Sequence, residues 1–184
     1  MFKKPFWNSD KVLSLSDILV SLCTLIVFTY QTTLIRKQQY MSVYPHLDMG
    51  HYYTYTVNYK YILANSGLGP ARILEVDIED HTGQKFDAVE EYLYSKITEE
   101  DTVFFYNSGL YPGRLIKAEE ELALIGLLDK EMSEPLGIPD ASIYMAARIS
   151  ELLSGDSVTI NVVYESIYGE KWRASNQFNV PTEL

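Results

Sequence analysis

Residues 12–35 spell VLSLSDILVSLCTLIVFTYQTTLI, and this stretch decides how the rest of the chain is organised. It contains one acid, Asp17, and no base, proline or glycine, and basic residues stand on both sides of it (Lys3, Lys4 and Lys11 before, Arg36 and Lys37 after). As a helix rising about 1.5 Å per residue it would extend roughly 36 Å, enough to cross a hydrocarbon core of about 30 Å. We therefore expect a transmembrane helix over residues 12–35, preceded by a basic and aromatic flank at residues 1–11.

Two other structures contain a similar apolar segment. A secretory signal peptide has the same length and basic start, but it ends in small residues at a cleavage site, which residues 29–36 do not offer. A core helix of a soluble domain is also short and apolar, but bases at both ends and scattered Ser and Thr fit it poorly. Three bases precede the stretch and two follow it, so the positive-inside rule leaves both orientations open. The single Cys23 cannot form a disulfide within the chain, so cysteine usage excludes neither compartment.

One face of this helix carries small and polar side chains. At 100° per residue, Asp17, Phe28 and Gln31 share a stripe about 100° wide with Ser14, Ser21 and Thr24. Such side chains hold helices together in lipid, and an acid within a span commonly faces protein or water. Alternatively, Asp17 lies at the interface and only fixes the depth of the helix. Our hypothesis is that the stripe contacts a second copy of the chain or a partner helix.

The rest of the chain has the size and pattern of one β-rich domain. Residues 36–41 contain no glycine or proline, so we expect them to continue the helix as a stalk, with the domain spanning residues 42–184. Residues 41–184 hold 23 acids against 10 bases, a formal charge of −13. Because an acidic domain repels phosphate backbones, we expect no contact with nucleic acid. The acidic runs at 99–101 and 119–121 are interpreted as solvated surface.

Alternation and turn residues predict a series of short antiparallel strands. In Thr56–Leu63, Tyr59 and Tyr61 occupy one face and Ile62 the other, which is typical of a half-buried strand. Further expected elements, in chain order, are a strand at 73–78, a helix at 88–97, short strands at 103–106 and 114–117, a longer strand at 121–128, a helix from 139 to about 153, and a hairpin of 158–164 with 171–178. The pattern predicts a mainly β fold, an immunoglobulin-like antiparallel sandwich with one or two inserted short helices, and Trp172 near its interior.

The order of these pieces resembles a group of uncharacterised bacterial membrane-anchored proteins. The motifs that carry the resemblance are Tyr30-Gln31 and Arg36-Lys-Gln-Gln39 at the end of the span, Ser42-Val-Tyr-Pro45, Asn65-Ser-Gly-Leu-Gly-Pro-Ala71, Pro112-Gly-Arg-Leu-Ile116 and Val163-Tyr-Glu-Ser-Ile-Tyr-Gly-Glu-Lys-Trp172. The Asn65–Ala71 turn also resembles one in immunoglobulin-like bacterial surface modules. Neither resemblance implies a reaction or a ligand. Cysteines that we expect in that group near Val163 and Tyr164 are missing from this sequence, so no thiol role is implied there.

Candidate residues for chemistry are few. His46, His51 and His81 lack metal-ligand spacing, and Asp77, Glu79 and Asp80 are too sparse for a calcium loop, so we interpret them as strand-end residues.

The turn at 65–71 has two interpretations. Its amides could bind an anion or a partner strand, or Gly67 and Gly69 could serve a turn that needs positive φ. We interpret the turn as structural.

We expect no catalytic, cofactor-binding or metal-binding residues. The leading hypothesis is a non-catalytic binding, accessory or sensor module, anchored by a single pass in the bacterial inner membrane. The alternative is a membrane effector, for example of phage-defence type, whose helix oligomerises on a signal. The expected partners are the lipid bilayer and another copy or a membrane protein that contacts the span.

Overall fold

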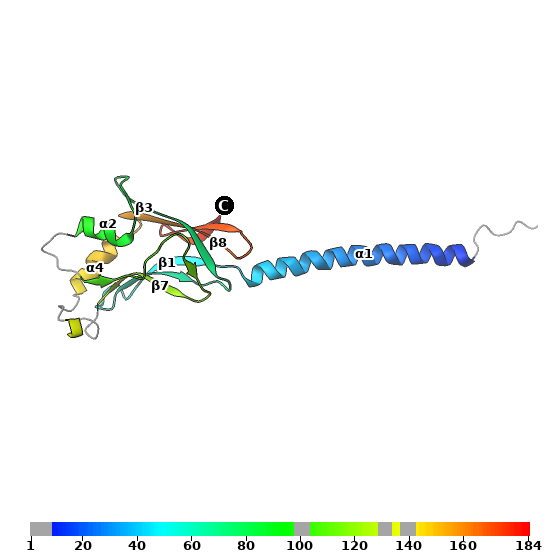
Figure 1. Ribbon diagram of the computed structural model, residues 1–184, viewed down its shortest axis with the longest axis horizontal. Helices are drawn as coiled ribbons and strands as arrows, with labels where there is room; N and C mark the ends of the chain where they lie inside the picture. The colour runs from blue at the N-terminus through cyan, green and yellow to red at the C-terminus, as the bar shows by residue number, and fades with distance from the viewer. Residues whose placement is uncertain (1–8, 98–103, 129–133, 137–142) are drawn as a thin grey trace, which may run out of the picture. The chain divides into compact units, whose positions relative to one another are not determined.

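The computed structural model describes residues 9–97, 104–128, 134–136 and 143–184. The chain divides into two compact units, residues 1–42 and residues 43–184. The first unit holds the helix α1, Ser9–Ser42, and the second holds two antiparallel β-sheets with short helices (Figure 1).

The helix α1 has the length and composition that crossing a membrane requires. Its part from Asp10 to Ser42 contains an 18-residue window with a mean hydropathy of 2.1, and none of that window is buried by protein. The helix continues past Ile35 to Ser42 and ends before Pro45, because a proline disfavours helical geometry in the residue before it. The expected helical stalk at residues 36–41 is thus part of α1.

The second unit is a sandwich of two sheets. The first sheet has the order β1 (Leu47–Tyr52), β2 (Lys60–Asn65), β7 (Glu121–Leu127), β5 (Phe105–Tyr106). The second has the order β10 (Phe178–Glu183), β9 (Lys171–Ser175), β8 (Val158–Glu165), β3 (Ala71–Asp80), β4 (Lys85–Phe86), with β6 (Leu115–Ile116) also paired to β3. Helices α2 (Val89–Lys96) and α4 (Ile143–Leu152) and a 3-10 turn, Glu134–Leu136, complete the described part.

The core lies between these layers and confirms the mainly β fold. Leu63 and Ile125 come from the first sheet, Ile73 and Val162 from the second, and Leu93 from α2, and all five are fully buried. The helix expected at 88–97 is present as α2, whose buried face presents Val89, Tyr92 and Leu93. The helix expected from residue 139 is described from Ile143 onward, and its start lies outside the described residues.

The closing hairpin forms as the alternation predicts. β8 pairs antiparallel with β9, and Tyr164 stands opposite Trp172 in the register. Trp172 is only 6% exposed and stacks on the Tyr164 ring with centroids 5.8 Å apart. The prediction that this tryptophan lies at the packed interior is confirmed.

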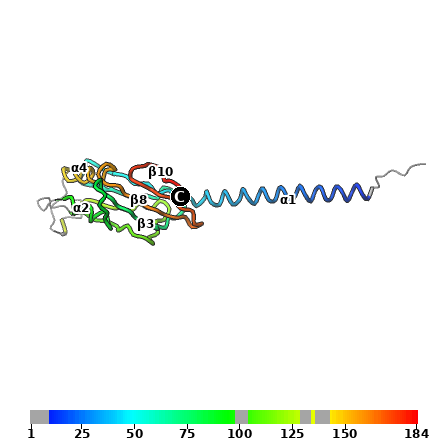
Figure 2. Tube along the Cα trace, turned by 90° about the horizontal axis from the view of Figure 1, so that it is seen from above, coloured from blue at the N-terminus to red at the C-terminus, as the bar shows by residue number. Residues whose placement is uncertain are grey.

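The strand expected over 171–178 is in fact two strands. β9 ends at Ser175, the chain turns at Asn176, and β10 returns alongside β9 at the edge of the second sheet (Figure 2). The Asn176 side chain fixes this turn, because its Nδ2 donates to the Val158 carbonyl (2.8 Å) and its Oδ1 accepts from the Ile160 amide (2.9 Å). β10 was not predicted because it contains Pro181, and a proline argues against a strand in the interior of a sheet. β10 tolerates the proline because it is an edge strand.

The strand expected at Thr56–Leu63 begins later than predicted. β2 starts at Lys60, and the residues before it form turns in which the Thr56 and Tyr59 amides donate to the Tyr53 and Thr56 carbonyls, respectively. Tyr59, Tyr61 and Leu63 all belong to the core, so the predicted alternation holds along β2. Ile62, expected on the open face, lies outside that core cluster but is only 3% exposed, so the opposite face of β2 is covered as well.

The strand expected at 73–78 also departs from strict alternation. Strict two-residue alternation would place Ile73 and Ile78 on opposite faces, yet both are buried in the core. The register against β8 passes from Ile73–Tyr164 to Glu75–Val163, so Leu74 is an extra residue in β3. A β-bulge of this kind lets residues of opposite parity face the same side.

Candidate functional site

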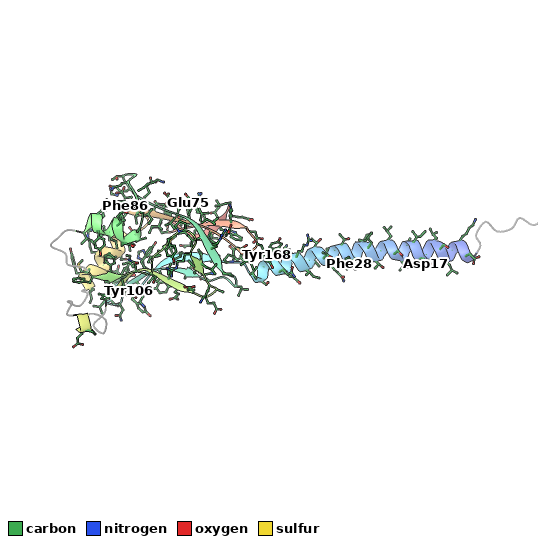
Figure 3. All side chains as sticks on the ribbon, viewed as in Figure 1. Asp17, Phe28, Glu75, Phe86, Tyr106 and Tyr168 are labelled. Carbon is green, nitrogen blue, oxygen red and sulfur yellow. The ribbon has the colours of Figure 1, made fainter. Side chains whose placement is uncertain are left out.

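The helix α1 places the predicted stripe on its surface. Asp17 and the small stripe residues are exposed, as is Gln31, and the side chains of Asp17 and Phe28 project from the helix (Figure 3). The Ser14 hydroxyl donates to the Asp10 carbonyl (2.9 Å) and the Thr24 hydroxyl to the Val20 carbonyl (2.8 Å). These bonds satisfy the hydroxyl donors within the helix and leave oxygen lone pairs free to accept from a partner.

The segment that leads from α1 into the sandwich, residues 43–46, is clamped by the domain; we call it the lead-in segment. Its central anchor is Asn65, the last residue of β2, which is 1% exposed. Asn65 Oδ1 accepts from the amides of His46 and Gly67, both at 3.1 Å, and Nδ2 donates to the carbonyls of Gly69 (2.8 Å) and Lys117 (3.0 Å). One side chain thus joins three segments that are far apart in sequence.

The two glycines of the 65–71 turn are required for close approach and not for positive φ, which corrects the expectation. Neither Gly67 nor Gly69 has a positive φ. A Cβ on Gly69 would lie 1.8 Å from the Val43 carbonyl oxygen, and one on Gly67 would lie 2.4 Å from the Tyr44 carbonyl oxygen. The amides of Ser66 and Leu68 donate to carbonyls of the lead-in segment. The turn therefore packs against the lead-in segment of its own chain, which supports the structural interpretation but with a different role for the glycines.

Aromatic side chains close the other side of the lead-in segment. The Tyr44 ring meets Trp172 edge-on with centroids 5.1 Å apart. The Tyr164 hydroxyl accepts from the Leu47 amide (3.3 Å) and lies 3.5 Å from the Pro45 carbonyl, to which it donates. Burial raises the pKa of Tyr164, so the hydroxyl keeps its proton and can serve both as donor and as acceptor.

The acids considered for calcium serve the fold instead. Asp80 was expected at an exposed strand end, but its side chain is fully buried, because it caps the β3–β4 turn and pairs with Lys96 of α2 (2.8 Å). Its Oδ1 accepts from the Thr82 hydroxyl and amide. The bond from Lys96, followed by those from Thr82, lowers the pKa of Asp80. Asp77 pairs with Lys85 (2.6 Å). Within the described ranges, no group of three His, Cys, Asp or Glu side chains is placed to hold a metal ion.

A surface that the sequence did not single out lies at the far end of the first sheet. β1 runs from Leu47, opposite Asn65, to Tyr52, opposite Lys60, so the β1–β2 loop is at the end remote from the lead-in segment. We call residues 52–57 the tyrosine loop. Tyr52, Tyr53 and Tyr55 in it are 43%, 64% and 74% exposed.

The tyrosine loop has a fixed conformation. Tyr53 has a φ of 56°, a left-handed geometry that is unfavourable for a bulky side chain. The amide and hydroxyl of Thr56 both donate to the Tyr53 carbonyl at 3.0 Å and hold it there. At the base of the loop, the Tyr59 hydroxyl lies 2.9 Å from His51 Nδ1, and burial lowers the pKa of His51. The sequence signal for this site was the density of tyrosines between residues 52 and 61. The predicted strand began at Thr56 and so included only the end of the loop.

Comparisons with protein-family models, with curated proteins and with solved structures find no match for this chain.

Proposed function

We propose that this chain is a membrane-anchored binding module, an accessory or sensor subunit whose partner is a protein. In this proposal α1 crosses the bacterial inner membrane, and an immunoglobulin-like sandwich binds the partner through the tyrosine loop. The resemblance to bacterial membrane-anchored proteins supports the location. The observation that carries the proposal is the tyrosine loop, which exposes three aromatic rings at the end of the first sheet remote from the lead-in segment.

The chemistry of the tyrosine loop suits recognition of a protein surface. Tyrosines offer large and rigid contact area at a low cost in side-chain entropy, and neighbouring Thr and Asn side chains add adaptable hydrogen bonds. The left-handed Tyr53 stores backbone strain, and such strain gathers at binding and catalytic sites. The domain charge of −13 favours a basic or neutral partner and disfavours nucleic acid. We propose binding and not catalysis, because the buried polar residues Asn65 and Asp80 are occupied in holding the fold.

Photocrosslinking in native membranes tests the proposal. A photoreactive phenylalanine replaces Tyr55 in the full chain, and a matched variant carries it at Thr182, an exposed position in the half of β10 nearer the lead-in segment. We expect one discrete adduct from position 55, and we expect it to disappear when Tyr53→Ser is added. An adduct pattern that is the same for both positions, or that survives Tyr53→Ser, would contradict the assignment of the loop.

A second candidate function rests on the stripe of α1. We propose as the alternative that the helix is an effector whose stripes meet in an oligomer when the domain receives a signal. Support comes from small side chains on one exposed face, which let helix backbones approach closely in lipid. Ser21→Leu with Thr24→Leu should weaken crosslinking between copies in native membranes, whereas Leu19→Ala with Ile26→Ala on the opposite face should not. Equal crosslinking from both pairs would remove this alternative.

A further inference from the structure

Four large apolar side chains are exposed where the chain joins the sandwich. Leu68 is 69% exposed, Leu115 53%, Ile167 59% and Tyr168 48%. They come from three segments that are far apart in sequence: the β2–β3 turn, the short strand β6, and the tip of the β8–β9 hairpin. A soluble surface that exposes neighbouring large apolar side chains commonly contacts a membrane or another protein.

Strand register and hydrogen bonds place these side chains at one end of the sandwich. In β3, Arg72 pairs with Leu115 on one side and with Glu165 on the other, and Ile167 and Tyr168 follow Glu165 at the hairpin tip. On the adjoining segment, the Leu68 amide donates to the Tyr44 carbonyl at 3.0 Å. All four exposed side chains therefore belong to the end of the domain that holds the lead-in segment.

This end of the domain follows the apolar stretch of α1 after a short length of chain. Val43 follows Ser42, the last residue of α1, and the apolar stretch of that helix ends at Ile35. The seven residues between them add about 10 Å of helix, whereas the headgroup layer extends roughly 5–7 Å beyond the hydrocarbon core. Where α1 spans a membrane, Val43 thus follows within a few Å of the headgroup layer, a gap that an exposed Leu, Ile or Tyr side chain can bridge.

We propose that Leu68, Leu115, Ile167 and Tyr168 form a lipid-contact surface that lies on the bilayer crossed by α1. Its occupant is the boundary between headgroups and acyl chains, where aliphatic side chains leave water and a tyrosine keeps its hydroxyl hydrated. The contact is apolar in character, because a domain of charge −13 is repelled by anionic lipid and gains nothing from lipid charge. This inference rests on the proposed function in one respect, namely that α1 spans the membrane.

Fluorescence quenching in reconstituted vesicles tests the lipid contact. The full chain is placed in phosphatidylcholine vesicles that contain spin-labelled lipids, and an environment-sensitive fluorophore is attached to one thiol at a time. The native Cys23 carries the label in one sample; the other samples carry it at Ile167→Cys or Asn179→Cys, each with Cys23→Ser. Asn179 is an exposed position near the start of β10, at the opposite end of the sandwich, and serves as the matched control.

We expect strong quenching of the Cys23 label by deep spin labels, and of the 167 label by shallow ones, with a blue shift of its emission. The 179 label should stay unquenched, and Leu68→Ser with Leu115→Ser should reduce quenching at 167. If Cys23 is quenched but 167 behaves like 179, the lipid contact is wrong while the span stands. If Cys23 is not quenched, the span fails, and the lipid contact with it. A blue shift at 167 in native membranes only would assign this surface to a protein partner and overturn the proposal.

Discussion

Replacing Asn65 by alanine should remove the anchor of the lead-in segment and destabilise the sandwich severely. The substitution deletes four hydrogen bonds of 2.8 to 3.1 Å at a residue that is 1% exposed. Each of the four bonds contributes about 1 kcal/mol to stability, so the loss of unfolding free energy is about 4 kcal/mol. The amides of His46 and Gly67, left without their acceptor, make this a lower bound. A domain at the lower end of the usual stability range of about 5–15 kcal/mol would then be close to unfolding.

Urea unfolding of the full chain in detergent micelles measures this loss. Trp172 fluorescence reports on the sandwich, because the Trp172 ring packs against Tyr44 of the lead-in segment. Trp7→Phe removes the signal of the second tryptophan. With a slope of about 2 kcal/mol per M, we expect the midpoint to fall by about 2 M. The matched control is Ser66→Ala, which loses one exposed hydrogen bond to Asp48 and should shift the midpoint by less than about 0.3 M. A similarly small shift for Asn65→Ala would refute the anchoring role.

Three further substitutions test other parts of the fold. Gly69→Ala should cost at least about 3 kcal/mol of unfolding free energy in the urea assay, because the new Cβ would overlap the backbone of the lead-in segment. The control is Gly50→Ala, whose new Cβ meets only one ring atom at 3.5 Å and which should cost under about 1 kcal/mol. Trp172→Ala should cost on the order of 3 kcal/mol by near-ultraviolet circular dichroism, and a loss below about 0.5 kcal/mol would place the ring on the surface. The pKa of Asp80 is lowered chiefly by Lys96, so its ionised form stabilises the fold above the unfolded pKa of about 4, and this stabilisation is lost as the pH falls towards the lowered folded pKa. Asp80→Asn should therefore flatten the acid side of a plot of thermal midpoint against pH. An unchanged slope would contradict the ion pair.

Local patterns in the sequence predicted those elements whose side chains obey one period. The span was visible because its apolar residues are contiguous, and the hairpin of β8 and β9 because every second residue of β8 is buried. The same rule failed at Leu74, where an extra residue in β3 reverses the alternation, since a bulge depends on the neighbouring strand and leaves no local signature.

Contacts between distant segments were beyond prediction for a related reason. Gly67 and Gly69 are typical of a turn by composition, but their purpose is the close approach of the lead-in segment, which precedes them by more than twenty residues. The buried position of Asp80 depends on Lys96 in a different element. The tyrosine loop was not predicted, because the alternation seen at Tyr59 and Tyr61 extends back to Thr56. In the structure the chain turns there instead, held by hydrogen bonds from Thr56 to the Tyr53 carbonyl.

Thiol accessibility in sealed membrane vesicles tests the central claim, a single span with the sandwich on one side, most directly. The full chain with Cys23→Ser carries one new cysteine, either Lys4→Cys before the span or Lys171→Cys in the sandwich, and the wild type carries only Cys23. A membrane-impermeant maleimide should label one of the two new cysteines in intact vesicles and the other only after permeabilisation, while Cys23 stays unlabelled throughout. Labelling of positions 4 and 171 from the same side, or ready labelling of Cys23, would contradict the account.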